Sequence, residues 1–281
     1  MSHKGVIIFC ALILGSVALP KPEIEDTSIY FEEVSPNSRI VGGIIADNGA
    51  HPYMAALMTG YVGLIFICGG SIITPWSILS AAHCIVPVYS DGALVSSLRI
   101  SVGSNYWEQG VLYKVIGNAT HAEYNSRSIK NDIGLLFTET AIRYSKLIQP
   151  IAISYKHIEG EINVMATGWG SRTVNGAIRM LLREIKLQTV GGLRCKEDVE
   201  RSGIIHNMRP PAVDPWLEVC TTHEEGAGHG TCRGDSGGPL FRMDTREQIG
   251  VVSWGLPCAL GAPDMFTRLS SYRDWLVDHI K

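Results

Sequence analysis

Short apolar runs separated by turn-forming residues dominate the chain from Ile40 onward, and long stretches of apolar residues at helical spacing are rare. Glycine, asparagine, aspartate, serine and proline separate these runs, and many short strands between such residues are typical of a β-barrel or a β-sandwich. The pattern predicts strands over residues 64–73, 98–103, 111–116, 133–138, 161–167, 181–190, 239–242 and 248–254. We therefore expect an all-β protein.

One helix is predicted, at the C-terminal end of the chain. Its apolar positions recur at helical spacing at Tyr272, Trp275, Leu276 and Ile280. Ser271 is followed three residues later by Asp274, a pairing that predicts an N-cap. We expect the aromatic residues of this helix to pack into the core.

The first 18 residues have the features of a secretory signal peptide. Lys4 supplies a positive charge, residues 6–14 are almost wholly apolar, and small residues precede a cut after Ala18. The alternative is a membrane anchor, but the apolar run is shorter than the roughly 20 residues that span a bilayer, and two prolines follow it. The sequence therefore predicts secretion to the extracellular space and no membrane association.

Residues 19–39 form an acidic leader that contains three prolines and shows no periodicity. Arg39 then precedes the segment Ile40-Val41-Gly42-Gly43. A basic residue before an apolar one is a common dipeptide, so its meaning depends on the residues downstream.

Composition and charge narrow the class of protein. The chain has 281 residues, of which 46% are hydrophobic and 18% charged, so it is not intrinsically disordered. Its formal charge of −3 gives no reason to expect nucleic acid as a partner. Of its seven cysteines, Cys10 lies in the signal peptide. Six cysteines remain after the signal peptide is removed. An even number of cysteines in a secreted protein predicts disulfide bonds, because the extracellular space is oxidising.

Three motifs carry candidate chemistry, and they supply His83, Asp132 and Ser236 in that order. A serine hydroxyl becomes a good nucleophile when an imidazole takes its proton, and the imidazole needs an acceptor at its other nitrogen. This chain order is one of the known orders of such a triad. The backbone N–H groups of Gly234 and Ser236 are candidate donors to an oxyanion. Taken alone, the histidine is more often structural and the aspartate could be a turn residue.

With these motifs the chain resembles the trypsin/chymotrypsin family of serine endopeptidases, in particular the digestive enzymes of arthropods. The resemblance covers residues 40–281 and rests on Ile-Val-Gly-Gly at 40–43, Ala-Ala-His-Cys at 81–84, Asp-Ile at 132–133, Gly-Trp-Gly at 168–170, Gly-Asp-Ser-Gly-Gly-Pro at 234–239, Ser-Trp-Gly at 253–255 and Pro-Asp-Met-Phe-Thr-Arg at 263–268. It implies that His83 is the general base, Asp132 its orienting partner and Ser236 the nucleophile. Gly134 stands where the family more often has alanine, which we expect to matter little.

The resemblance also implies a fold. We expect two six-stranded antiparallel β-barrels with the site between them. The first would span about residues 40–145, and the second, with the C-terminal helix, about residues 146–281. The disulfide pairs implied are Cys68–Cys84, Cys195–Cys220 and Cys232–Cys258. The segment between Cys195 and Cys220 is longer than usual and contains three prolines, so we expect an exposed loop near the rim of the cleft.

Activation by proteolysis is a further implication. A trypsin-like protease would cut after Arg39, and the new amino group of Ile40 would insert and pair with Asp235. The charge at Ile40 does not exist before cleavage, so a buried ion pair of this kind can act as a switch. We expect the uncut chain to be nearly inactive.

The positions that form the primary specificity pocket in the family carry an unusual set of residues. Gly230 stands at the base, where trypsin-like members have aspartate, and Asp264 stands on the wall, where glycine is usual. Ser253, Trp254 and Gly255 supply the opposite wall, and Gly255 leaves the mouth open.

Two readings of this pocket remain. A carboxylate in an apolar slot favours a cationic guest, whereas a glycine base leaves depth for large apolar side chains. We expect cleavage after Arg or Lys, or a broad preference that includes large apolar residues. The alternative is a chymotrypsin-like preference, with Asp264 pointing away or paired with His229.

We expect no cofactor and no metal. All six mature cysteines occupy disulfide positions of the family, so none is free for zinc. Residues 103–110, which correspond to the calcium loop of some relatives, offer only Glu108 as an acid. Asn118 begins the N-glycosylation sequon of the chain, and such matches are often unused.

The expected partners are protein or peptide substrates, an activating protease and protein protease inhibitors, and the enzyme is expected to be a monomer. Two other interpretations stay open. One is a non-catalytic homologue that acts as a binding scaffold, although all three triad residues are present. The other is a regulatory cascade protease, although the short cysteine-free leader favours a digestive or general proteolytic role.

Overall fold

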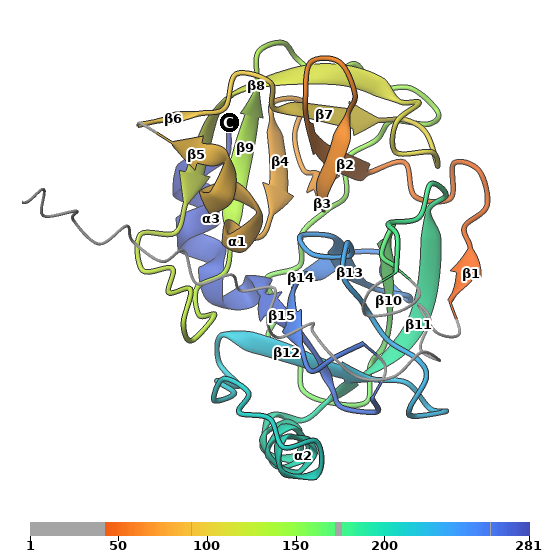
Figure 1. The fold of residues 1–281 in the computed structure, drawn as a ribbon, viewed down its shortest axis with the longest axis vertical. Helices are drawn as coiled ribbons and strands as arrows, with labels where there is room; N and C mark the ends of the chain where they lie inside the picture. The colour runs from red at the N-terminus through yellow and green to blue at the C-terminus, as the bar shows by residue number, and fades with distance from the viewer. Residues whose placement is uncertain (1–42, 91, 172–175, 259) are drawn as a thin grey trace, which may run out of the picture.

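The computed structural model describes residues 43–90, 92–171, 176–258 and 260–281. The predicted signal peptide, the acidic leader and the Arg39–Ile40 bond lie outside the described residues. Within them, strands form two antiparallel β-barrels, which occupy the upper and lower halves of Figure 1.

The first barrel closes on itself with six strands in the order β2-β3-β4-β9-β8-β7. Their bounds are Met54–Thr59 (β2), Ile65–Ile72 (β3), Ser77–Ser80 (β4), Arg99–Val102 (β7), Val111–Thr120 (β8) and Gly134–Thr138 (β9). A small hairpin of β5 (Tyr89–Ser90) and β6 (Ala93–Leu94) lies between β4 and β7 in the chain.

The second barrel is a ring of six strands in the order β11-β10-β13-β14-β15-β12, closed by the pairing of β11 with β12. Their bounds are Asn163–Gly168 (β10), Arg183–Val190 (β11), Glu218–Thr222 (β12), Pro239–Arg242 (β13), Gln248–Gly255 (β14) and Asp264–Arg268 (β15). A short strand, β1 (Ile44–Ile45), pairs with the outer edge of β11, so the start of the described chain is attached to the second barrel. The expected all-β fold of two six-stranded barrels is confirmed.

Each of the eight predicted strands overlaps an observed one, but four strands of the two barrels, β2, β4, β12 and β15, were not predicted, nor were the short strands β1, β5 and β6. Strand β2 shows why. Ala55 and Leu57 face the interior of the first barrel, while Met54, Ala56 and Met58 pack into a second apolar cluster with Trp169 and Phe241 of the second barrel. The apolar run of β2 consists of Met, Ala and Leu and lacks the β-branched and aromatic residues that favour strands, whereas the equally buried β14 contains Ile and Val and was predicted.

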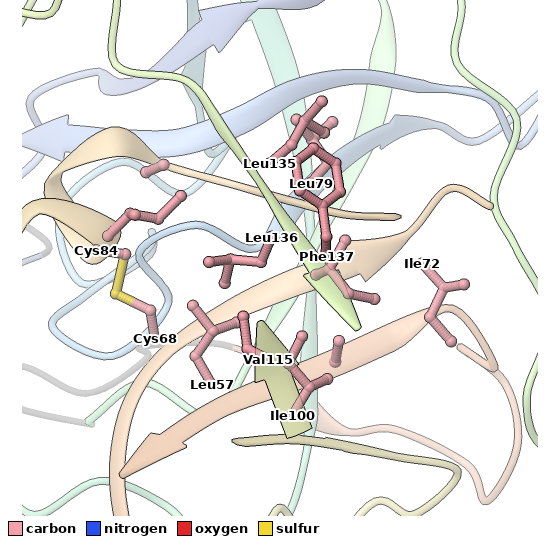
Figure 2. Packing of buried hydrophobic residues seen from close by; sticks show 14 of the residues in the cluster. Leu57, Cys68, Ile72, Leu79, Cys84, Ile100, Val115, Leu135, Leu136 and Phe137 are labelled. Carbon is pink, nitrogen blue, oxygen red and sulfur yellow. A yellow bond between two sulfur atoms is a disulfide. The ribbon is translucent and has the colours of Figure 1, made fainter. Parts of the chain in front are cut away.

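The largest apolar cluster fills the first barrel. Figure 2 shows part of it, with Leu57, Val115 and Ile100 grouped together and the Cys68–Cys84 disulfide to one side. The C-terminal segment adds to this cluster through Leu269, Tyr272 and Leu276, which are all buried. The predicted core role of this segment is confirmed, and it packs against the first barrel although it follows the second in the chain.

Two predictions about helices need correction. The C-terminal segment is a 3₁₀ turn, η3 (Leu269–Tyr272), followed by α3 (Arg273–His279), and its N-cap residue is Tyr272. Ser271 does not cap it, because the Ser271 hydroxyl donates to the carbonyl of Trp216 instead.

The second correction concerns the segment from Cys195 to Cys220, which was expected to be an exposed loop. Most of its first half belongs to a 14-residue helix, α2 (Gly192–Ile205), which projects at the lower edge of Figure 1. The prolines of the segment come after the helix and therefore do not interrupt it. Among the described residues, no helix is both long enough and apolar enough to cross a membrane.

Candidate active site

His83 lies in a short helix, α1 (Ala82–Ile85), that directly follows strand β4 of the first barrel. The disulfide between Cys68 and Cys84 ties this helix to β3. The backbone N–H of His83 donates to one carboxylate oxygen of Asp132 at 2.9 Å, and its ring Nδ1 lies 2.8 Å from the other. The two contacts fix the orientation of the imidazole and leave Nε2 pointing away from the aspartate.

Asp132 is 1% exposed and is held by residues of the second barrel as well. The Ser253 hydroxyl donates to its carboxylate at 2.6 Å, and the Thr267 hydroxyl donates to its carbonyl at 2.7 Å. Burial disfavours the charged carboxylate, but the charge of His83 and hydrogen bonds from His83 and Ser253 outweigh burial, so the pKa of Asp132 lies below its usual value. For His83 burial also opposes the charge, and the attraction of Asp132 outweighs it and raises the pKa of the imidazole.

The segment that carries Ser236 packs against the residues that lead to His83. The carbonyl of Ser236 accepts a hydrogen bond of 2.8 Å from the N–H of Gly69 in β3, next to Cys68. A Cβ at Gly237 would collide with the Ser80 hydroxyl and would lie 3.3 Å from the nitrogen of Ala81, so the serine segment closely approaches the start of α1. Residues from β3, α1 and the segment before β13 thus meet at one place.

Gly234 has the backbone conformation that an anion-binding loop requires. Its φ of +97° is one that residues with a side chain rarely adopt, and a Cβ there would meet Ile178 at 2.5 Å. Across the described ranges, no acceptor pairs with the backbone N–H of Gly234 or of Ser236. Two N–H groups without an internal acceptor beside a serine hydroxyl can bind a developing oxyanion.

Asp235 points away from the serine into the protein. Its carboxylate accepts hydrogen bonds of 2.9 Å from the N–H groups of Gly170 and Cys232, and a Cβ on Gly168 or Gly170 would overlap it. Burial raises the pKa of Asp235 to about 7, although both hydrogen bonds favour the charged form.

Three of the residues assigned to the specificity pocket, Gly230, Gly255 and Asp264, lie together. The carboxylate of Asp264 faces Gly230, where a Cβ would lie 2.7 Å from it, and it also lies beside Gly255. One of its oxygens accepts the N–H of Thr231 at 2.5 Å, and burial raises its pKa to about 7. The alternative pairing with His229 is wrong, because His229 pairs with Glu225 at 3.0 Å.

The polar groups of Ser253 and Trp254 form hydrogen bonds elsewhere and do not contact the Asp264 carboxylate. The Ser253 hydroxyl is bound to Asp132, and the indole N–H of Trp254 donates to Glu218 at 2.7 Å. Glu218 is 4% exposed and also accepts from the Lys130 ammonium at 2.7 Å. Sequence reasoning missed Glu218 and Lys130, since 88 residues separate them in the chain and neither belongs to a motif.

The structure contains the three disulfides Cys68–Cys84, Cys195–Cys220 and Cys232–Cys258, which are the pairs that the family resemblance implied. Asn118 lies within strand β8, half-buried, and its side-chain amide donates to the Thr120 hydroxyl at 3.2 Å. Its use as a glycosylation site stays a prediction.

The chain is similar in sequence to a family model and to several known proteins. The family model described as Trypsin matches residues 40–276. A protein named Chymotrypsin-2 from Vespa crabro is 35% identical over 239 residues, which are 84% of this chain and 98% of that protein. A Trypsin from Phaedon cochleariae is 31% identical over 248 residues, 87% of this chain and 89% of that protein. A Clotting factor G beta subunit from Tachypleus tridentatus is 33% identical over 256 residues, 85% of this chain and 79% of that protein.

Proposed function

The chain belongs to the trypsin family and is a serine endopeptidase, and we propose that it cleaves peptide bonds with His83, Asp132 and Ser236 as its catalytic triad. The observation that carries this proposal concerns the buried Asp132 carboxylate. One of its oxygens lies 2.8 Å from Nδ1 of His83 and also accepts a hydrogen bond from the Ser253 hydroxyl. A non-catalytic scaffold has no need for this arrangement.

In the proposed mechanism Ser236 attacks the carbonyl carbon of the substrate while Nε2 of His83 takes the hydroxyl proton. The N–H groups of Gly234 and Ser236 bind the oxyanion that forms. His83 then gives the proton to the leaving amine, and an acyl-enzyme remains. Water, deprotonated by His83, hydrolyses the acyl-enzyme and restores the serine. Asp132 stabilises the imidazolium at each stage and keeps the ring in the required tautomer.

Cleavage after Arg39 is the proposed activation step. Arg39 and Ile40 lie outside the described residues, so the support comes from Asp235. Its carboxylate is buried with two N–H donors, and burial raises its pKa to about 7. An ammonium group brought to this carboxylate would hold it in the charged form and would fix the adjoining Gly234–Ser236 segment.

We also propose that the enzyme is secreted, with residues 1–18 as its signal peptide, and that its role is digestive or broadly proteolytic. The three disulfides support an oxidising compartment. Its partners would be protein substrates, an activating trypsin-like protease and protein inhibitors, and it would act as a monomer.

The proposed preference at the residue before the cut is cationic, or broad with large apolar residues included. Support comes from the Asp264 carboxylate, which faces Gly230 and Gly255. A buried carboxylate in that place attracts the head of Arg or Lys, and its raised pKa also allows a neutral form that tolerates apolar guests. A chymotrypsin-like preference is the competing proposal.

Labelling by a serine-reactive phosphonate tests the catalytic proposal. After trypsin cuts the precursor at Arg39, we expect one label per chain at Ser236 and hydrolysis of reporter peptides. The Ser236→Ala chain should carry no label, and an Arg39→Gln chain should stay unlabelled after the same treatment. A correctly cut chain that neither labels nor hydrolyses any reporter would show that it is a scaffold.

Reporter peptides ending in Arg, Lys, Phe, Tyr and Leu test the specificity proposal. We expect Asp264→Gly to lower kcat/KM for Arg and Lys relative to Phe by about 10-fold or more, the size of one lost charge-assisted contact. An unchanged ratio would favour the chymotrypsin-like alternative.

A further inference from the structure

Two histidines and one glutamate come together in the loop between β12 and the Gly230 segment. The loop carries His223, Glu225 and His229, and each can bring one ligand atom to within 4.8 Å of the others. The His223 and His229 rings stack with their centroids 4.1 Å apart, and Nε2 of His229 lies 3.0 Å from a carboxylate oxygen of Glu225.

The backbone of the loop brings these side chains together. His223 directly follows strand β12, and a tight turn closes where the N–H of Gly226 donates to the carbonyl of His223 at 3.0 Å. Gly226 has a φ of +69°, which residues with a side chain rarely adopt, so the chain can reverse there and lay His229 over His223. Glu225 sits on this turn with its side chain exposed.

From this geometry we propose that His223, Glu225 and His229 form a binding site for Zn²⁺. Two imidazoles and one carboxylate form a ligand set that suits this ion. Ligand atoms about 2.1 Å from a tetrahedral zinc ion lie roughly 3.4 Å apart. The observed 3.0 Å between Nε2 of His229 and a carboxylate oxygen of Glu225 is close to that spacing, so a zinc ion bound to both atoms requires only a small movement of the two side chains.

His223 completes the site by a rotation of its ring. In the stack its Nδ1 accepts the N–H of Glu225 at 3.1 Å. The last torsion of histidine is broad, so the ring can turn out of the stack and direct a nitrogen to the ion. Space exists on its outer side, because His223 borders a surface hollow of about 330 Å³ that Lys186 and Met243 also line. Water takes the fourth position of the ion.

The proposed site contains no cysteine, whereas the expectation of no zinc rested on the cysteines. The other cluster of potential ligands within the described ranges is Cys68, His83 and Cys84. Both of its cysteines are joined in a disulfide and offer no thiolate. The side chains of His223, Glu225 and His229 form no covalent bond of this kind and can bind a metal ion.

Calorimetric titration with zinc chloride tests the proposal on the Ser236→Ala chain, which cannot digest itself, after residues 1–39 have been removed with trypsin. We expect one zinc ion per chain, and we expect His223→Gln and His229→Gln each to weaken binding by about 10-fold or more. Co²⁺ in place of zinc should give the visible absorption of a tetrahedral site, and both variants should lose it.

The matched control is His157→Gln. His157 also faces a glutamate, Glu159, at 3.1 Å, and the described residues show no second histidine grouped with that pair. This variant should bind zinc as the parent chain does. Glu225→Gln changes a largely exposed side chain, so we expect this variant to fold, and it too should weaken binding. A parent chain that binds no zinc, or folded His229→Gln and Glu225→Gln chains that bind it as tightly as the parent, would overturn the proposal.

Discussion

The hydroxyl of Ser253 donates a hydrogen bond of 2.6 Å to the same Asp132 oxygen that faces Nδ1 of His83. Ser253 belongs to strand β14 of the second barrel, whereas His83 belongs to the first, so this carboxylate joins the two barrels at the site. Because Ser253 sits next to Trp254, the same strand connects the triad to the proposed binding region for substrate.

Removal of this hydrogen bond should slow catalysis without unfolding the protein. Ser253→Ala takes away a donor to a buried charge, a contact worth about 1.5–3 kcal/mol, so we expect kcat to fall by about 10-fold or more. Steady-state kinetics on an activated enzyme would measure the change. Ser126→Ala, at an exposed turn, should leave kcat unaltered, and a Ser253→Ala enzyme with full kcat would show that the hydrogen bond does not support catalysis.

Acid should weaken the preference for Arg over Phe. Burial raises the pKa of Asp264 to about 7, so this carboxyl is charged above that pH and loses its charge as the pH falls through it. The ratio of kcat/KM for Arg and Phe reporters should therefore rise by up to about 10-fold between pH 6 and pH 8. The titration of His83 affects both reporters equally and cancels in the ratio. With Asp264→Asn the ratio should stay flat, and a flat ratio in the parent enzyme would contradict the role given to this charge.

The side chain of Ile85 packs against Gly134 and occupies the space that a larger residue would need. A Cβ at Gly134 would lie 2.5 Å from the Cδ1 of Ile85 and 3.2 Å from the carbonyl of Ala119. We expect Gly134→Ala to cost about 1–3 kcal/mol in free energy of unfolding, as overpacking does. Ile85→Val removes the colliding carbon, so the same glycine change should cost at least about 0.5 kcal/mol less in that background. Denaturant unfolding of the four chains measures this coupling, and strict additivity would mean that the collision is relieved elsewhere.

Removing one charge of the Lys130–Glu218 ion pair should lower the free energy of unfolding, because the other charge stays buried without a partner. Both side chains are largely buried, at 16% and 4% exposure, and lie 2.7 Å apart. Glu218→Gln leaves a buried ammonium without its countercharge and should lower the free energy of unfolding by about 3–5 kcal/mol. The double variant Glu218→Gln with Lys130→Met should recover part of that loss. Equal stability of the parent and Glu218→Gln chains in denaturant unfolding would show that Lys130 reaches water instead.

The local pattern of the sequence determined a good part of this protein. Short apolar runs between turn-forming residues located strands such as β11 and β14, and the helical spacing of Tyr272 and Leu276 located the core-facing side of the C-terminal segment. The triad candidates were found because each sits in a short motif whose chemistry can be reasoned from residue type. The number of barrels and the disulfide pairs came from family resemblance, not from the pattern itself.

Only the tertiary structure decided which distant residues meet. Strand β2 packs one face into the first barrel and the other against the second, a role that its short run of Met, Ala and Leu does not indicate. Glu218 acquires a role only where β12 brings it beneath Trp254 and next to Lys130. The sequence around Ser271 predicts an N-cap, but its hydroxyl donates a hydrogen bond to the carbonyl of Trp216, in another segment of the chain. Local propensity depends on a few neighbouring residues, whereas each of these contacts joins segments that are far apart in the chain, so their geometry exists only once the chain has folded.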